Sequence, residues 1–420
     1  MFKVKRVKRI VSLALLFAVW AYPAQAEVTV RGDSLFVDGK AFQARGASGQ
    51  TRLAELKARG ATVVRTYGEE SPAVLAEAQK LGLKVIFGFW LEHPRRGFDY
   101  NDRTSVDRQL AALRATVLKY KNSPALLAWG LGNEVESELT DDSIVWPAIG
   151  EAARLVKSLD PAHPRMAVLA EAGGSKIAKL MKAAPDIDLL GVNSYGDALL
   201  DLPSRVRAQG WTGPLIVTEL GAEGQWQAGS KPWGAAVELT STEKAARLRR
   251  YLHELGPKTA GQILFYWGQK QEVTPTWHSL FLPSGEMIEA ADVMSEFWGD
   301  PGANKAQNHA PRIVSFALAS GADSFTASTP FSARVTGLDA DRDALRVEWH
   351  VMAESRDLRK AGDIESVPQD FPNAVRNRKG SQSEWSAEIA GLSPGAYRLF
   401  VVLRDGKGAA ATGNLPFLIR

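Results

Sequence analysis

The first 300 residues alternate eight short apolar runs with segments of helical periodicity. The runs are β-branched or leucine-rich and continuously apolar, as expected for strands that are buried on both faces. They are Ala41–Ala47, Thr62–Tyr67, Lys84–Trp90, Leu126–Asn133, Arg165–Ala170, Ile187–Asn193, Leu215–Glu219 and Gln262–Trp267. Eight strand–helix units in about 260 residues match the usual size of a (β/α)8 TIM barrel. An open doubly wound sheet is the alternative, but Arg45–Gly49 is not a good glycine-rich phosphate turn.

The segments around these runs carry helix and turn signals of their own. Gly82 is typical of a helix end. Thr240 and Glu243 have the spacing of a capping box, in which a hydroxyl and a carboxylate satisfy free amide groups at a helix start. Val28–Arg31 and Ser34–Asp38 form a predicted hairpin ahead of the first run, which we expect to cover the bottom of the barrel.

A different pattern follows a polar linker. Turn residues separate six short runs: Ile313–Ala317, Phe331–Val335, Leu345–Met352, Glu384–Ile389, Tyr397–Arg404 and Leu415–Ile419. These runs predict an immunoglobulin-like β-sandwich, with residues 353–383 as a long polar connection. We therefore predict a barrel over residues 27–298, a linker over 299–310 and a sandwich over 311–420.

The charge of the chain is concentrated at its start. The formal charge is +4, and residues 1–26 hold five basic residues and no acidic one, which leaves 4 − 5 = −1 for the rest. A nearly neutral protein gives no reason to expect nucleic acid binding. The chain also has no cysteine, which excludes disulfides and a thiol nucleophile.

Residues 1–26 have the pattern of a signal peptide. A basic start is followed by the apolar stretch Ile10–Ala21 and by the small residues of Ala24–Ala26. The apolar stretch is shorter than the about 20 residues that a membrane span needs. We therefore expect export to the periplasm or secretion, with no membrane insertion after cleavage.

Polar and aromatic side chains mark the predicted carboxyl ends of the strands, where barrel enzymes carry their chemistry. Glu134 follows the fourth strand and Glu219 ends the seventh, so both are expected to face one cleft. Glycoside cleavage needs such a pair: one carboxylic acid protonates the leaving oxygen, and one carboxylate attacks or stabilises the sugar cation. The residues expected to bind substrate are Arg65, Tyr67, Trp90, His93, Asn133, Asn193, Tyr195 and Trp267.

Several of these candidates have a matching physical role. Arg65 can keep a carboxylate ionised through charge pairing. Asn133 can bond to a sugar hydroxyl, and Tyr195 can donate to the attacking carboxylate. Trp90 and Trp267 offer flat apolar faces that suit the C–H face of a pyranose.

Three motifs resemble a known group of enzymes. WGLGNE around Glu134, IVTELG around Glu219 and the strand-end Arg65 are similar to retaining glycoside hydrolases of clan A, and most like the barrel of glycoside hydrolase family 2. The resemblance covers about residues 30–298. It implies that Glu134 is the acid/base and Glu219 the nucleophile of a double displacement on a β-linked oligo- or polysaccharide. Unlike full-length family 2 enzymes, this chain places the barrel first and its sandwich second.

Alternatives remain for the site and for the function. Glu171, after the fifth strand, competes for the acid role, whereas Glu136 and Glu138 are expected on a solvated face. The same catalytic residues would serve a transglycosylase that remodels a β-glycan, and a non-catalytic carbohydrate-binding barrel is a further alternative. Six scattered histidines without an HExxH motif give no support for a metal, and no cofactor is predicted. Protein partners are unknown.

Overall fold

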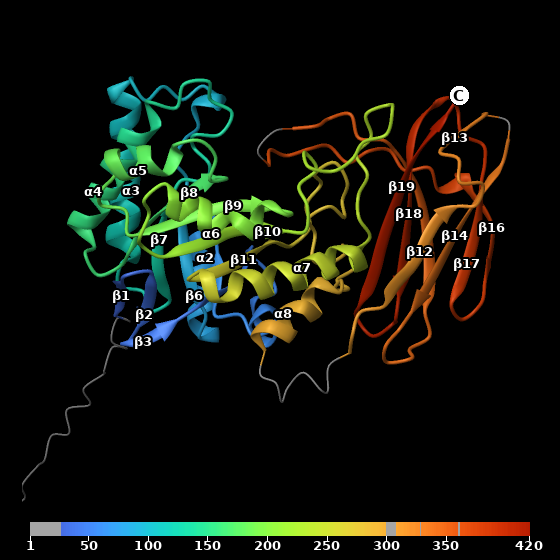
Figure 1. Ribbon diagram of the computed structural model, residues 1–420, viewed down its shortest axis with the longest axis horizontal. Helices are drawn as coiled ribbons and strands as arrows, with labels where there is room; N and C mark the ends of the chain where they lie inside the picture. Colours follow the sequence, from blue (N-terminus) through green and yellow to red (C-terminus); the bar gives the residue numbers. More distant parts are fainter. Residues whose placement is uncertain (1–26, 300–307, 328, 360–361) are drawn as a thin grey trace, which may run out of the picture.

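A computed structural model describes residues 27–299, 308–327, 329–359 and 362–420, so the predicted signal peptide lies outside the described residues. Eight parallel strands close into a barrel in the order β10-β11-β4-β5-β6-β7-β8-β9 (Figure 1). Their bounds are β4 (Ala44–Gly49), β5 (Val63–Arg65), β6 (Lys84–Phe89), β7 (Leu126–Leu131), β8 (Arg165–Ala170), β9 (Leu189–Tyr195), β10 (Leu215–Gly221) and β11 (Gly261–Trp267). The predicted TIM barrel is confirmed.

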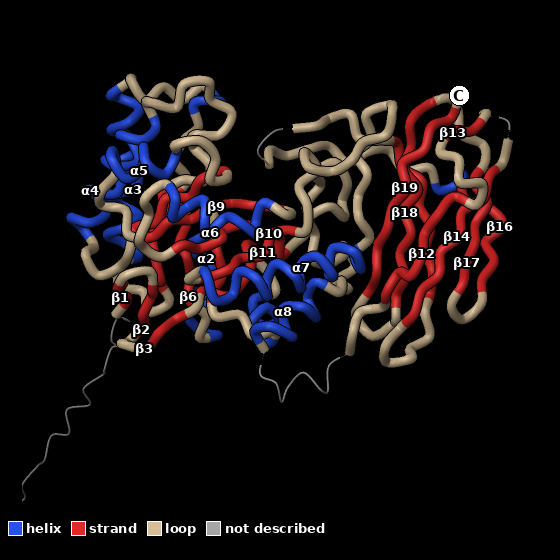
Figure 2. The backbone as a smooth tube through the Cα atoms, viewed as in Figure 1, coloured by secondary structure: helices blue, strands red, loops and turns tan. Residues whose placement is uncertain are grey.

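Helices surround the barrel and bury their apolar faces against its strands (Figure 2). They are α1 (Leu53–Ala58), α2 (Ser71–Leu81), α3 (Arg103–Tyr120), α4 (Val145–Leu159), α5 (Lys176–Ala183), α6 (Ala198–Ala208), α7 (Ser241–Leu255) and α8 (Ala290–Trp298). Both local signals are confirmed: Gly82 caps α2 with a φ of 66°, and Thr240 and Glu243 form the capping box of α7.

A small sheet covers the bottom of the barrel. It contains β1 (Val28–Arg31), β2 (Ser34–Val37) and a third strand that was not predicted, β3 (Lys40–Phe42). Side chains of β1 and β2 share one core cluster with inward residues of the barrel strands, such as Ile86 and Ile263. Because the amino ends of the strands are closed in this way, the opposite end is left for the site.

The C-terminal part is a sandwich of two four-stranded sheets, ordered β12-β14-β17-β16 and β13-β19-β18-β15. The bounds are β12 (Arg312–Leu318), β13 (Ser324–Phe325), β14 (Phe331–Leu338), β15 (Arg346–Ala353), β16 (Val375–Gly380), β17 (Glu384–Ile389), β18 (Gly395–Arg404) and β19 (Ala410–Ile419). Trp349 and Trp385 lie in its buried core. The connection predicted over 353–383 contains β16, which pairs with β17 along the sheet edge, so it is not entirely loop.

Buried polar contacts join the barrel to the sandwich. Arg398 of β18 is 1% exposed and donates to the carbonyl of Ala236 in the loop after β10. The same guanidinium pairs with Glu354, and it donates to Asn414, whose amide donates to the buried Glu238. Figure 1 shows the loops at the carboxyl end of the barrel strands lying beside the sandwich. Within the described residues, no helix is both long and apolar enough to cross a membrane.

Candidate active site

Glu134 lies in a tight turn that leaves the end of β7. Its φ is 53°, in the left-handed region that non-glycine residues seldom adopt, and Gly132 before it has a φ of 75°. Two bonds to neighbouring strands hold the turn: the Gly132 amide donates to Phe89 at 2.9 Å, and the Glu134 amide donates to Val168 at 3.0 Å. Strain of this kind persists only where the surroundings impose it, and it is common at functional sites.

A bulge places Glu219 at the end of β10. The pairing of β10 with β9 shifts by one residue between Val217 and Glu219, so Thr218 has no counterpart on β9. Such bulges re-aim side chains at the rims of barrels. The Thr218 hydroxyl donates to Asn193 at 2.8 Å, which ties the bulge to the neighbouring strand.

Three donors hold the Glu219 carboxylate. Arg65, which is 2% exposed, donates to Oε1 at 3.1 Å, and the Tyr67 hydroxyl donates to the same oxygen at 2.8 Å. Tyr195 donates to Oε2 at 2.8 Å. Burial raises the pKa of both tyrosines well above 10, so they remain protonated and serve as donors. The expected pairing of Arg65 and Tyr195 with Glu219 is therefore present in the structure.

Two asparagines connect Glu219's surroundings to Glu134. The Oδ1 of Asn133 accepts from Arg65 at 2.6 Å and from the amide of Asn193 at 3.1 Å. The same Asn193 amide donates to Glu134 at 2.7 Å. These bonds bring both glutamates into one hydrogen-bonded network.

The two carboxylates have different electrostatic surroundings. Burial, followed by the negative charge of Glu219, raises the pKa of Glu134 from 4.5 to about 8. Glu134 thus keeps its proton at neutral pH, whereas Glu219 has a guanidinium and two hydroxyls directed at its oxygens. A pair of carboxyl groups divided in this way is suited to act as an acid and a base or nucleophile.

Both glutamates line a cleft of about 630 Å³ at the carboxyl end of the barrel strands. Its lining also includes Tyr67, Trp90, Asn133 and Tyr195 of the predicted set. Several lining residues were not predicted. Phe265 and Tyr266 belong to β11, and the others lie in loops without a recognisable motif: Arg96, Gln225, Gln269, Lys270, Glu272, Arg359 and Gly362. Trp226, whose side was undecided from sequence, is 63% exposed on this cleft.

Four of the predicted substrate-binding residues do not line the cleft: Arg65 and Asn193, which are buried and bond to the glutamates, and Trp267 and His93. Trp267 is 0% exposed, and its ring nitrogen donates to the carbonyl of Thr51. The pairing of β11 with β4 is irregular between Leu264 and Trp267, which changes the side that each residue faces. Phe265 and Tyr266 line the cleft instead, so the expectation for Trp267 is corrected.

His93 is 1% exposed and stacks on Trp90, with 4.8 Å between ring centroids. Burial, together with nearby Arg95 and Arg96, lowers its pKa to about 4. His93 therefore supports the wall of the cleft from behind and does not line it, which corrects its predicted contact with substrate.

Among the alternative glutamates, Glu138 is exposed, as predicted, and lines the cleft, whereas Glu171 and Glu136 lie outside it. Glu171 accepts from Arg205 and Ser194 at 2.9 and 2.6 Å and does not line the cleft. Glu136 is 3% exposed and pairs with Lys176, so its expected place on a solvated face is wrong.

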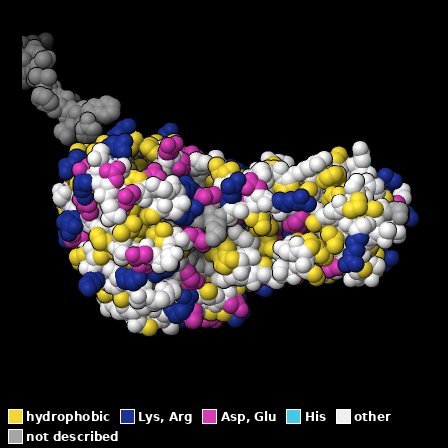
Figure 3. Space-filling model, turned by 90° about the horizontal axis from the view of Figure 1, so that it is seen from above, with side chains coloured by type: hydrophobic (Ala, Val, Ile, Leu, Met, Phe, Trp, Pro, Cys, Tyr) yellow, Lys and Arg dark blue, Asp and Glu magenta, His cyan; other side chains and the backbone are white. Residues whose placement is uncertain are grey.

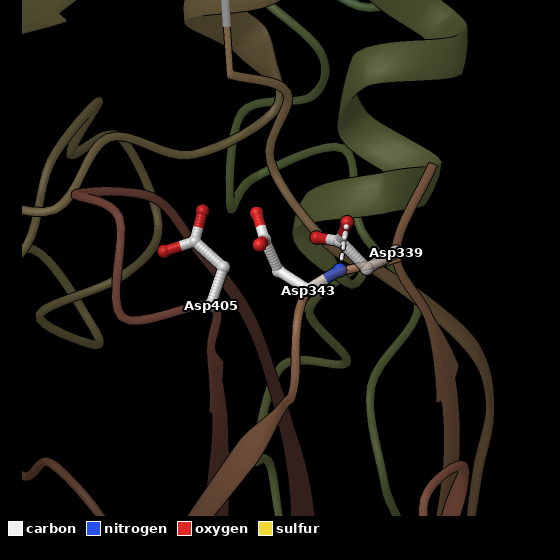
Figure 4. Close-up of side chains that lie close together, drawn as sticks. All are labelled: Asp339, Asp343 and Asp405. Carbon is white, nitrogen blue, oxygen red and sulfur yellow. Dashed lines mark hydrogen bonds between the residues drawn. The ribbon is translucent and has the colours of Figure 1, made fainter. Parts of the chain in front are cut away.

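One group of carboxylates among the described residues has the spacing of a metal site. Asp339, Asp343 and Asp405 lie in turns of the sandwich, with their ligand oxygens within 4.8 Å of one another (Figure 4). One oxygen of Asp339 already accepts from the backbone of Asp341 and Asp343, and Asp405 accepts from Asn308. The group belongs to the sandwich and takes no part in the cleft.

Comparisons with known proteins relate this chain to enzymes that act on sugars. No family model matches the chain. Mannan endo-1,4-β-mannosidase F from Aspergillus clavatus is 24% identical over 238 residues, which are 46% of this chain and 53% of that protein. A probable mannan endo-1,4-β-mannosidase F from Emericella nidulans is 30% identical over 122 residues, 25% of this chain and 28% of that protein. The match thus spans about half or less of these relatives.

Solved structures share the fold. An FMN-binding β-glucuronidase from Facaelibacterium prausnitzii L2-6 superposes with a TM-score of 0.52 at 14% identity, over 94% of this chain and 59% of that one. A glycoside hydrolase family 2 β-galacturonidase from Eisenbergiella tayi gives 0.51 at 16% identity, over 65% and 54%. The predicted resemblance to glycoside hydrolases of clan A, with a barrel like that of family 2, is therefore confirmed.

Proposed function

We propose that this chain is a retaining glycoside hydrolase that cleaves β-linked oligo- or polysaccharides. One observation carries the proposal: two carboxyl groups in one cleft have opposite environments. Glu219 accepts three hydrogen bonds, one of them from a buried guanidinium, while burial and the charge of Glu219 raise the pKa of Glu134 to about 8. The first is suited to attack and the second to give a proton.

In the first step, Glu219 attacks the anomeric carbon while Glu134 gives its proton to the glycosidic oxygen. The bond between the anomeric carbon and that oxygen breaks, and the sugar becomes an ester of Glu219. Glu134, now a carboxylate, takes a proton from a water molecule as the water attacks the same carbon. Glu219 leaves as a carboxylate, and the sugar keeps its β configuration.

Other residues orient the sugar. Because two donors occupy Oδ1 of Asn133, its amide nitrogen is left to donate to a hydroxyl beside the reacting carbon. Trp90 and Trp226 offer apolar ring faces in the cleft. The matched relatives are described as mannan endo-1,4-β-mannosidases and a putative β-glucuronidase, so β-mannans and β-glucuronides are the first substrates to test.

The two roles can be separated with an aryl glycoside that carries an activated phenol. Glu134→Ala should still release a burst of phenol, because a good leaving group needs no proton, yet it should lose most activity on natural glycan. Glu219→Ala should show no burst, because the attacking group is gone. A burst from Glu219→Ala alone would reverse the assignment, and near-wild-type turnover in both variants would refute it.

Product analysis of the wild-type enzyme distinguishes the transglycosylase alternative. Longer oligosaccharides that accumulate at high substrate concentration would show that a sugar acceptor outcompetes water at the ester. Product stereochemistry, followed by NMR, tests retention, and a ligand-bound structure should place the carboxyl groups about 5–5.5 Å apart.

A further inference from the structure

A segment of the sandwich forms part of the cleft wall. It runs from β15 toward β16, and its described parts are residues 354–359 and 362–371, here called the mouth segment. Arg359 and Gly362 line the same cleft as the two catalytic glutamates. Side chains of both charges gather where the barrel meets the sandwich (Figure 3).

Consecutive residues of the mouth segment bind loops from two different parts of the barrel. The carbonyl of Gly362 accepts from Lys270 at 2.8 Å, in the loop after β11. The carboxylate of Asp363 accepts two bonds from Arg95, at 2.9 and 3.2 Å, and one from Arg96, both in the loop after β6. Because Gly362 and Asp363 are consecutive and neighbouring Cα atoms are about 3.8 Å apart, the segment holds these two loops close to each other.

A third contact secures the segment. Glu365 is 5% exposed and accepts from the Val273 amide at 2.7 Å and from the Arg359 amide at 3.1 Å. At its start, Glu354 is paired with the buried Arg398. The segment is therefore fixed to the sandwich at its start and to the barrel at residues 362–365.

The position of these contacts around the barrel determines which side of the cleft the mouth segment covers. In the barrel order, β4 and β5 lie between β11 and β6. The loops after β4 and β5 are short, covering residues 50–52 and 66–70, whereas those after β6 and β11 cover 90–102 and 268–289. The mouth segment lies across the part of the barrel rim over β4 and β5, which these short loops would otherwise leave open.

Trp90 lies on the side of the cleft that the mouth segment covers. It lines the cleft and also a second hollow of about 860 Å³, which reaches toward α3. The guanidinium of Arg96 lies 5.1 Å from the centre of the Trp90 ring, and Asp363 holds that guanidinium. Trp90 thus lies where the two hollows meet, Arg96 lines the cleft beside it, and Asp363 holds Arg96 in place; these three residues are here called the partition.

We propose, on the basis of the proposed hydrolase function, that the sandwich closes one end of the cleft and makes the enzyme act on chain ends. A polysaccharide that crossed the mouth over β4 and β5 would meet the mouth segment. The polysaccharide must therefore end at this partition, and the enzyme removes short products from one end of the polysaccharide. Asp363 is a positioning residue that acts through Arg96 and Trp90.

The test compares wild type, Asp363→Ala, Asp363→Ala/Glu365→Ala and, as a matched control, Asp370→Ala, which removes an exposed carboxylate of the same segment. Substrates are β-1,4-mannohexaose and cellohexaose labelled at the reducing end, with soluble galactomannan and β-glucan. The readout is the ratio of mid-chain to terminal cleavage, from product lengths and from viscosity loss per reducing end. This ratio is independent of the total rate.

We expect wild type and Asp370→Ala to release terminal products. Removal of the Asp363 and Glu365 carboxylates should raise the ratio of mid-chain to terminal cleavage about fivefold or more, as for loss of an ion pair. Hydrogen exchange at the Val273 amide should rise in the double variant, because its acceptor is gone. Mid-chain cleavage by wild type, or an unchanged ratio in a double variant with faster Val273 exchange, would overturn the inference. Absence of hydrolysis by wild type on every glycan would instead overturn the proposed function on which it rests.

Discussion

Replacing Glu134 with glutamine should remove the alkaline limb of the pH profile. Burial and the charge of Glu219 raise the pKa of Glu134 to about 8, so the acid form predominates at pH 7 by about ten to one. Above this pKa, each further pH unit lowers the protonated fraction about tenfold. Activity that needs the proton is therefore present below the pKa and lost as the pH rises through it.

The assay measures kcat/KM against pH for two substrates. On an oligosaccharide, wild type should lose activity above pH about 8, and Glu134→Gln should be slower by about 10²–10⁴, the usual contribution of a general acid, with no alkaline limb. On a dinitrophenyl glycoside, formation of the glycosyl-enzyme should change far less, because the leaving phenolate needs no proton.

Glu171→Gln is the control, because this carboxylate lies outside the cleft and is paired with Arg205. It should keep the wild-type profile on both substrates. An alkaline limb that persists in Glu134→Gln, or one that disappears in Glu171→Gln, would refute the assignment of the acid.

Three further substitutions test separate parts of the site, and a fourth tests a buried ring outside it. Arg65→Ala removes the guanidinium from Glu219 and Asn133, so kcat/KM should fall about 10²-fold, or about 2.7 kcal/mol. Normal cleavage by a variant that melts at the wild-type temperature would contradict this role. Tyr195→Phe removes one bond to the charged Glu219, for which a loss of about 1.5–3 kcal/mol in transition-state stabilisation is expected, seen in kcat with little change in KM. Trp226→Ala should raise the KM for oligosaccharides and change the free energy of unfolding by less than about 0.5 kcal/mol, because this ring is 63% exposed. Trp267→Ala provides the contrast: a fully buried ring should cost about 3–5 kcal/mol of stability, seen as a lower melting temperature.

The strands were predictable where burial on both faces produces an unbroken apolar run. Arg165–Ala170 is such a run and has the predicted bounds, and Glu384–Ile389 also has the predicted bounds, although its buried and less buried residues alternate. Val375–Gly380 was missed because its sequence, VRNRKG, is polar and almost wholly exposed. This edge strand forms through its backbone pairing with β17, which leaves no hydrophobic pattern in the sequence.

The site was predictable as far as strand ends determine it. Glu134 and Glu219 follow buried runs, and parallel strands of a closed barrel bring such positions to one rim. The error at Trp267 arose because a local irregularity in the pairing of β11 reverses which neighbour faces the cleft. Arg359 could not be found, because its place depends on how a second domain packs against the barrel, and no local pattern encodes that.

The buried Arg398 has a consequence for how the protein unfolds and evolves. Its guanidinium is satisfied by the barrel carbonyl of Ala236 and by Glu354 and Asn414 of the sandwich, and Asn414 in turn donates to Glu238 of the barrel. Withdrawing either half would leave charged or polar groups of the other without these partners, which is costly for buried groups. The two halves are therefore expected to melt in one cooperative transition. They are also expected to be inherited together, because a substitution of Glu238 would remove the acceptor of Asn414 in β19.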